Sequence, residues 1–105
     1  MNAKGSKYLN LLEALGRGET PKMKVFGNSM MPKIKSGSTL TYQKAETYEK
    51  GDVVFSKVHG RYIDAHQITQ KDGQGRYLIS NNLGWDNGWT TQVFGKVITI
   101  EPPKT

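Results

Sequence analysis

The sequence predicts a small, mainly β domain, built as a coiled antiparallel sheet or partly open barrel with one short N-terminal α-helix. Three observations favour this class. The chain has 105 residues, so it can bury only one modest core. Between residues 23 and 100, short segments rich in branched and aromatic residues alternate with glycine-rich turns. Helical spacing of apolar residues occurs near the N-terminus, before these segments begin.

An amphipathic helix is expected over residues 6–15. Its apolar stripe, at steps of three and four residues, consists of Tyr8, Leu11, Leu12 and Leu15. Ser6 is the expected N-cap, and Gly16 and Gly18 are residues at which a helix would stop. A helix of about three turns is a weak membrane anchor, so the stripe is expected to dock on the domain or on a partner.

The remaining chain is expected to form a β domain at residues 23–100. The predicted strands are 23–26, 39–42, 53–58, 61–68, 77–80 and 92–100. Residues 59–60 and 71–75 have the composition of hairpin turns. The helix and a linker then occupy residues 1–22, and residues 101–105 form a tail.

Composition and charge exclude several classes. The chain has no cysteine, which excludes disulfides, thiolate metal sites and a cysteine nucleophile. With two histidines and no cysteine it shows no metal-ligand spacing, so we expect no metal and no cofactor. It has no apolar run near the ~20 residues that cross a bilayer and no secretory signal, so we expect a soluble cytoplasmic protein without a membrane span.

The formal net charge of +6 is uneven. Residues 1–35 hold seven Lys and Arg against two Glu. This basic N-terminal third is compatible with weak contact to nucleic acid or an acidic protein. It is equally typical of a solvated surface, because no arginine cluster or recognition-helix pattern accompanies it.

The most informative stretch is GNSMMP at residues 27–32, followed by GDVV at residues 51–54. The pattern G-x-S-M-x-P, with G-D-V-V opening a later strand, resembles the serine-protease superfamily of LexA, UmuD-type proteins and signal peptidases. The resemblance covers roughly residues 23–100. It implies the LexA C-terminal or signal-peptidase type of β fold, and serine peptidase chemistry with Ser29 as nucleophile. Taken without the resemblance, the stretch is more typical of a structural turn with methionine in the core.

The bacterial members of this superfamily use a lysine as base, in a strand shortly after G-D-V-V. Here His66 holds that place, 37 residues after Ser29, and no lysine lies between Lys57 and Lys71. The sequence is similar in this respect to the signal peptidases of the endoplasmic reticulum, which carry histidine. Histidine, with an ordinary pKa of about 6.5, can accept the serine proton near neutral pH. The alternative is a half-buried strand histidine that makes a hydrogen bond and has no catalytic role.

A histidine base works best beside a carboxylate that fixes its tautomer. The resemblance implies an aspartate in a G-D-N-N-like segment, but Asn81 or Asn82 stands there. Asp86 is therefore the predicted orienting carboxylate, although Asp-Asn-Gly at residues 86–88 is also typical of a turn. Asp64, two residues from the base on the same strand face, is the alternative.

A peptide substrate would lie extended near the candidate serine. Met30, Pro32 and Trp85 are the predicted substrate-binding residues, although Trp85 could equally cap the core or contact a partner. Only 22 residues precede the first predicted strand, with no helix-turn-helix, membrane anchor or Ala-Gly or Cys-Gly dipeptide. We therefore expect a free-standing serine endopeptidase that cleaves another protein. The alternative, favoured by Asn81 and Asn82, is a catalytically inactive peptidase-fold module that binds a protein or nucleic acid.

Overall fold

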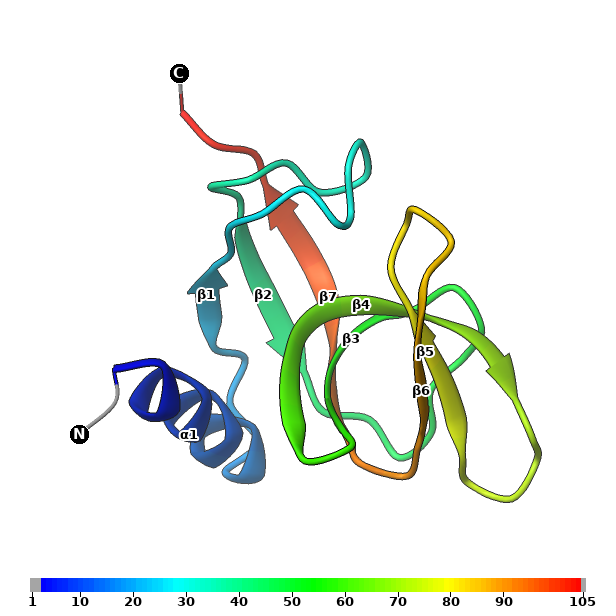
Figure 1. Cartoon of the computed structure of the whole chain (residues 1–105). Coiled ribbons are helices and arrows are strands. Elements are labelled where there is room, and N and C mark those ends of the chain that lie inside the picture. Colours follow the sequence, from blue (N-terminus) through cyan, green and yellow to red (C-terminus); the bar gives the residue numbers. More distant parts are fainter. Residues whose placement is uncertain (1–2, 105) are drawn as a thin grey trace.

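One curved sheet forms most of the molecule. The computed structural model describes the backbone of residues 3–104 and the side chains of residues 7–104. Its elements are α1 (Ala3–Gly16), β1 (Lys22–Lys24), β2 (Thr39–Gln43), β3 (Val53–Val58), β4 (Arg61–Lys71), β5 (Tyr77–Ser80), β6 (Asp86–Thr90) and β7 (Val93–Glu101) (Figure 1). All strand pairs are antiparallel, in the order β1-β2-β7-β3-β4-β5-β6. The predicted mainly β class with one short helix is confirmed.

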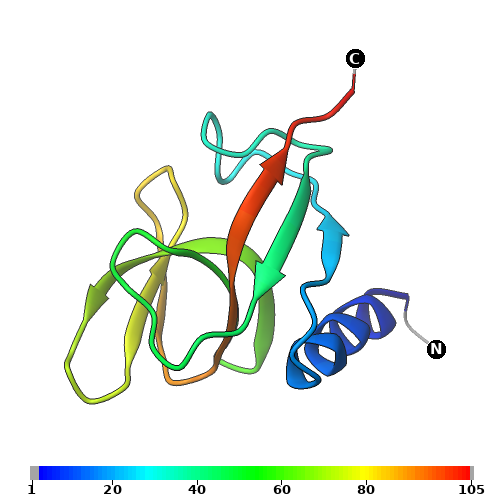
Figure 2. The ribbon, with the colours of Figure 1, turned by 180° about the vertical axis from the view of Figure 1, so that it is seen from behind.

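The sheet curls because its strands carry bulges. Two register shifts, one against β3 and one against β5, each leave an extra residue in β4, and a bulge bends the strand that carries it. Figures 1 and 2 show β4 arching over the molecule. The curl brings the corner between β6 and β7 back to β3, where the N–H of Lys57 donates to the carbonyl of Gln92 at 2.9 Å and Thr90 Oγ1 donates to the carbonyl of Lys57 at 2.6 Å. Strands β3 to β6 therefore form a partly closed barrel.

Two hydrophobic clusters lie on the two faces of this sheet. The first packs under α1 and includes Leu11, Leu15, Leu40, Tyr42 and Phe55. The second lies inside the curl and includes Tyr48, Val54, Val58, Ile68 and Ile79. Strand β3 serves both, because successive side chains of a strand point to opposite faces. This explains why Val53, Val54 and Phe55, the first three residues of β3, are all apolar.

Helix α1 ends as the sequence predicts and begins earlier. The N–H of Gly18 donates to the carbonyl of Leu15 at 3.0 Å, and the N–H of Glu19 donates to that of Ala14 at 3.0 Å, a double closure typical of a glycine-terminated helix. The helix starts at Ala3, so Ser6 lies within it and is not its N-cap. The apolar stripe starts only at Tyr8, so the spacing could not indicate a polar first turn.

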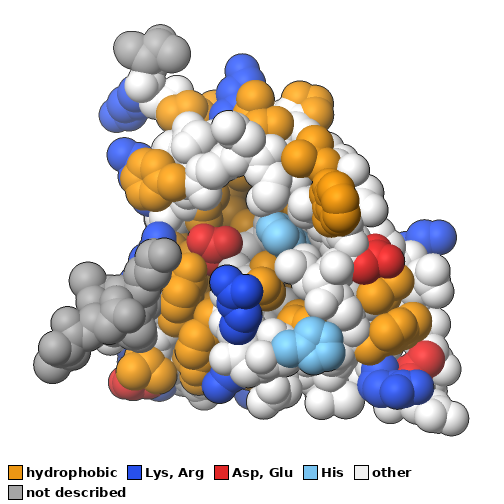
Figure 3. Space-filling view, in the orientation of Figure 1, with side chains coloured by type: hydrophobic (Ala, Val, Ile, Leu, Met, Phe, Trp, Pro, Cys, Tyr) orange, Lys and Arg blue, Asp and Glu red, His pale blue; other side chains and the backbone are white. Residues whose placement is uncertain are grey.

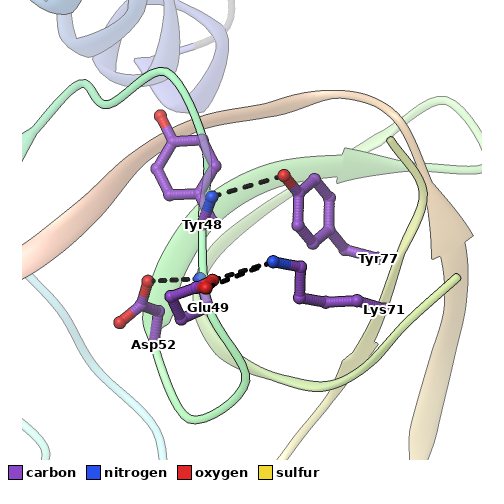
Figure 4. Close-up of polar contacts among 5 residues, drawn as sticks. All are labelled: Tyr48, Glu49, Asp52, Lys71 and Tyr77. Atoms are coloured by element: carbon purple, nitrogen blue, oxygen red, sulfur yellow. Dashed lines mark hydrogen bonds and ion pairs between the residues drawn. The ribbon is translucent and has the colours of Figure 1, made fainter. Parts of the chain in front are cut away.

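The loop between β2 and β3 is fixed to the strands beside it (Figure 4). The N–H of Tyr48 donates to Tyr77 Oη at 3.3 Å, and Lys71 Nζ lies 2.8 Å from Glu49 Oε2. Asp52 accepts a hydrogen bond from the N–H of Glu49 at 2.8 Å and thereby closes the turn that leads into β3. These contacts fix the start of β3, the strand that pairs with β4 and therefore with His66.

Two segments differ from the expectation. Residues 86–90, predicted as a turn-rich segment, form β6 along the edge of β5. Glu101, assigned to the tail, ends β7 opposite Thr39. The helix within residues 3–104 is neither long nor apolar enough to cross a membrane.

Candidate active site

Ser29 lies on the loop between β1 and β2. The turn is closed by hydrogen bonds from the N–H of Met31 to the carbonyl of Asn28 at 3.1 Å and from the N–H of Ile34 to the carbonyl of Met30 at 2.9 Å. Gly27 has a φ of +112°, a backbone angle that residues other than glycine adopt only with strain. These constraints leave Ser29 half-buried at the corner of a defined turn.

Met30 anchors this turn. Its side chain is 4% exposed and belongs to the cluster under α1. Met30, predicted to bind substrate, is therefore placed to fix the loop, with its side chain in the core. The reason is local: Ser29 and Met30 are consecutive in a turn, so one faces outward while the other faces the core.

The structure brings Ser29 and His66 together. Ser29 Oγ lies 3.1 Å from His66 Nε2, a hydrogen-bond distance, and both side chains are half-buried. His66 lies on β4, opposite Val54 of β3. The two residues thus come from segments 37 positions apart in the chain.

The second nitrogen of the imidazole contacts Asn87. His66 Nδ1 lies 2.6 Å from Asn87 Oδ1. The pairing of β6 with β5 explains this position: Ile79 opposes Gly88 and Ser80 opposes Asp86, so Asn87 is the extra residue of a bulge. Bulges redirect side chains and occur often beside active sites.

Asp86, the predicted orienting carboxylate, takes another position. Its Oδ1 accepts a hydrogen bond from Ser80 Oγ at 2.7 Å, while Asn87 occupies the place beside His66. The alternative, Asp64, accepts a hydrogen bond at its backbone carbonyl from Tyr42 Oη at 2.6 Å. Sequence reasoning missed Asn87, because the bulge that turns it toward the imidazole leaves no mark in residue spacing.

Asn82 connects the serine loop to the loop between β5 and β6. Its N–H donates to the carbonyl of Ser29 at 2.9 Å, and its Nδ2 donates to the carbonyl of Met31 at 3.0 Å. Gln67 Nε2 donates to the carbonyl of Asn81 at 3.2 Å on the other side. Of the two asparagines at the position of the expected aspartate, Asn82 thus joins the two loops, and Asn81 is bound to β4.

Large apolar side chains are exposed on the same two loops. They are Phe26 at 69%, Leu83 at 62% and Trp85 at 72%. Pro32 is exposed as well. Figure 3 shows a hollow on this face, with apolar side chains around its upper rim and a histidine inside it. Exposed apolar groups gathered around a hollow are typical of a binding surface.

Two backbone donors at the Ser29 turn are without an acceptor among the described residues. The N–H groups of Ser29 and Met30 have no hydrogen-bond acceptor within the described part of the chain. Free N–H groups beside a nucleophile can stabilise an oxyanion. Among the residues that the structure describes, no group of three His, Cys, Asp or Glu side chains is arranged to hold a metal ion.

The molecule is thus a small β domain in which a serine and a histidine lie at hydrogen-bond distance. Residues 2–98 match the model of the family described as Peptidase S24-like, and because the match spans most of the chain, the protein belongs to that family. The predicted superfamily is therefore confirmed. A comparison with curated proteins finds no match.

Proposed function

We propose that the protein is a serine endopeptidase in which Ser29 is the nucleophile and His66 is the general base. The observation that carries this proposal is the 3.1 Å separation of Ser29 Oγ and His66 Nε2. An unactivated serine hydroxyl is a poor nucleophile, and a base within hydrogen-bond reach is the feature that changes this. Membership of a peptidase family supports the same chemistry.

The reaction follows from the positions of the donors and acceptors. His66 Nε2 accepts the proton of Ser29 Oγ as the oxygen attacks the carbonyl carbon of a peptide bond. The N–H groups of Ser29 and Met30 donate to the resulting oxyanion. The imidazolium then gives its proton to the leaving amine, an acyl-serine forms, and water activated by His66 hydrolyses it.

A protein segment in extended conformation is the proposed substrate. The hollow on this face offers the space (Figure 3), and the exposed Pro32 and Trp85 would contact the segment. Phe26 and Leu83 are further exposed apolar side chains of the same two loops. These exposed groups also support the second candidate, a peptidase-fold module that holds a protein segment without cleaving it.

Active-site labelling tests the proposal. A fluorophosphonate probe, read by intact mass, is expected to modify the wild type once, whereas Ser29→Ala and His66→Ala give no adduct. The matched control is His59→Asn: His59 is the other histidine, lies exposed in the turn between β3 and β4, and has a φ of 50° that asparagine tolerates. This variant should label like the wild type.

Cleavage of a peptide library is the second measurement, with the same four proteins. The wild type and His59→Asn are expected to cut, and the other two are not. If a wild type that unfolds cooperatively neither labels nor cleaves, the endopeptidase is rejected and the binding module takes its place.

A further inference from the structure

We propose that Asn87 is the positioning residue of this site and that its neutral side-chain amide holds His66 in the tautomer that Ser29 requires. The inference rests on the proposed function and adds a third residue to it. Its basis is the 2.6 Å separation of Asn87 Oδ1 and His66 Nδ1.

The tautomer follows from hydrogen-bond chemistry. An amide oxygen only accepts hydrogen bonds, so with Asn87 Oδ1 facing the ring, His66 Nδ1 carries the proton and donates the hydrogen bond. In a neutral imidazole the other nitrogen, Nε2, is then an acceptor. This is the nitrogen that lies 3.1 Å from Ser29 Oγ, and it is therefore ready to receive the serine proton. A ring with its proton on Nε2 would face the hydroxyl with a donor and could not act as a base.

The surroundings hold Asn87 in this place. On one side Asp86 is bound by Ser80 Oγ at 2.7 Å, and Ser80 Oγ in turn lies 2.8 Å from Thr69 Oγ1 of β4. On the other side Gly88 leaves room for the ring of His59, since a Cβ at Gly88 would lie 2.6 Å from His59 Nε2. The hydrogen bonds of Ser80 thus fix the bulge on the side of Asp86, as a positioning group requires.

An amide and a carboxylate at this position would act differently. Both orient the ring, but only a carboxylate stabilises the imidazolium by its charge. Asn87→Asp should therefore favour the charged ring and move the acid limb of the pH profile of labelling to higher pH. Asn87→Ala removes the acceptor and should lower the labelling rate roughly ten- to hundredfold, the loss expected for one buried hydrogen bond to the ring.

Nitrogen NMR of the imidazole tests the inference without relying on catalysis. With His59→Asn as background only one histidine remains, so the two ring nitrogens of His66 are read directly. In this background we expect the proton on Nδ1. Asn87→Ala should shift the population toward the Nε2-protonated form, and Asn87→Asp, which keeps the size and the acceptor, should retain it on Nδ1.

Asp86→Asn is the matched control, because it makes an equally small change one residue away and keeps the oxygen that Ser80 binds. It should leave the tautomer unchanged. An unchanged tautomer in Asn87→Ala, or an Asp86→Asn variant that alters it, overturns the inference. A wild type that fails to label while its tautomer still depends on Asn87 rejects the endopeptidase and leaves the positioning intact.

Discussion

Tyr42 shows how one buried hydroxyl ties the core to the strand that carries His66. The side chain is 0% exposed and its Oη donates to the carbonyl of Asp64 at 2.6 Å. The acceptor lies in β4 where the register against β3 shifts, two residues before His66. Burial, and then the negative charge of Asp64, raise the pKa of Tyr42 far above that of a free tyrosine.

Tyr42→Phe should lower the free energy of unfolding by about 1–2 kcal/mol near neutral pH, because a buried carbonyl loses its donor. The contribution of the hydroxyl is complete below the pKa of an unfolded tyrosine, about 10, and is lost as the pH rises toward the higher pKa of folded Tyr42. Urea unfolding across the alkaline range should therefore show the wild type losing stability more steeply than the variant. Parallel pH curves for the two proteins would contradict this role.

At the scale of elements, the bulge of β6 depends on Gly88. This residue has a φ of +135°, and a Cβ would meet His59 Nε2 at 2.6 Å and Val58 Cγ1 at 3.2 Å. Gly88 therefore leaves room beside β6 for the side chains of Val58 and His59. Asn87, which contacts His66, is the residue before this glycine.

Gly88→Ala should destabilise the protein by about 1–3 kcal/mol, through backbone strain and the contact with His59. His59→Ala has its own cost because residue 59 has a φ of 50°. In that background Gly88→Ala should cost less than it does alone, since the contact is removed and only the strain at residue 88 remains. Chemical denaturation of the two single variants and the double variant measures the coupling between them. Strictly additive losses would mean that the imidazole and the new methyl group do not meet.

Much of this architecture could be predicted from the sequence. Apolar spacing places α1 and most strands within a few residues, because each buries a regular stripe or face. β6 was not predicted, since Asp-Asn-Gly is a turn signal and the strand has few apolar residues. Its pairing with β5 is a tertiary effect that local composition does not contain.

The sequence likewise predicts only some residues of the candidate site. Ser29 and His66 could be proposed because a motif and a strand position single them out. The partner of His66 could not, because alternation along a strand fails at a bulge: Asp86 and Asn87 are adjacent, and only the register decides which faces the imidazole. Met30 was assigned to the substrate from its place beside Ser29, whereas packing against the core decides where its side chain points.

On the scale of the whole molecule, the site joins two parts of the sheet. Ser29 belongs to the loop between β1 and β2, whereas His66 and Asn87 belong to β4 and β6. Strand β7 pairs with both β2 and β3 and connects the two parts. Figures 1 and 2 show the loop after β1 and the loop after β5 at the same end of the molecule. The position of Ser29 against His66 therefore depends on how firmly these loops are joined.

Asn82 joins the two loops by two hydrogen bonds. Its N–H donates to the carbonyl of Ser29, and its Nδ2 donates to the carbonyl of Met31. Asn82→Ala keeps the backbone bond and removes the side-chain bond. We expect the amides of residues 27–34 to exchange with solvent several-fold faster, because local opening becomes easier while the core is untouched. The global free energy of unfolding should fall by no more than about 1.5 kcal/mol, the usual worth of one hydrogen bond.

Hydrogen exchange read by mass spectrometry, with urea unfolding followed by tryptophan fluorescence, separates these two effects. Thr91→Ala is the control, since Thr91 is exposed in the turn between β6 and β7, away from both loops, and should change neither. If the amides of residues 27–34 exchange at the same rate in Asn82→Ala as in the wild type, then β7 alone aligns the two parts of the sheet. If instead the loop opens while the fold persists, the distance between Ser29 and His66 is set by a side chain that takes no part in the core.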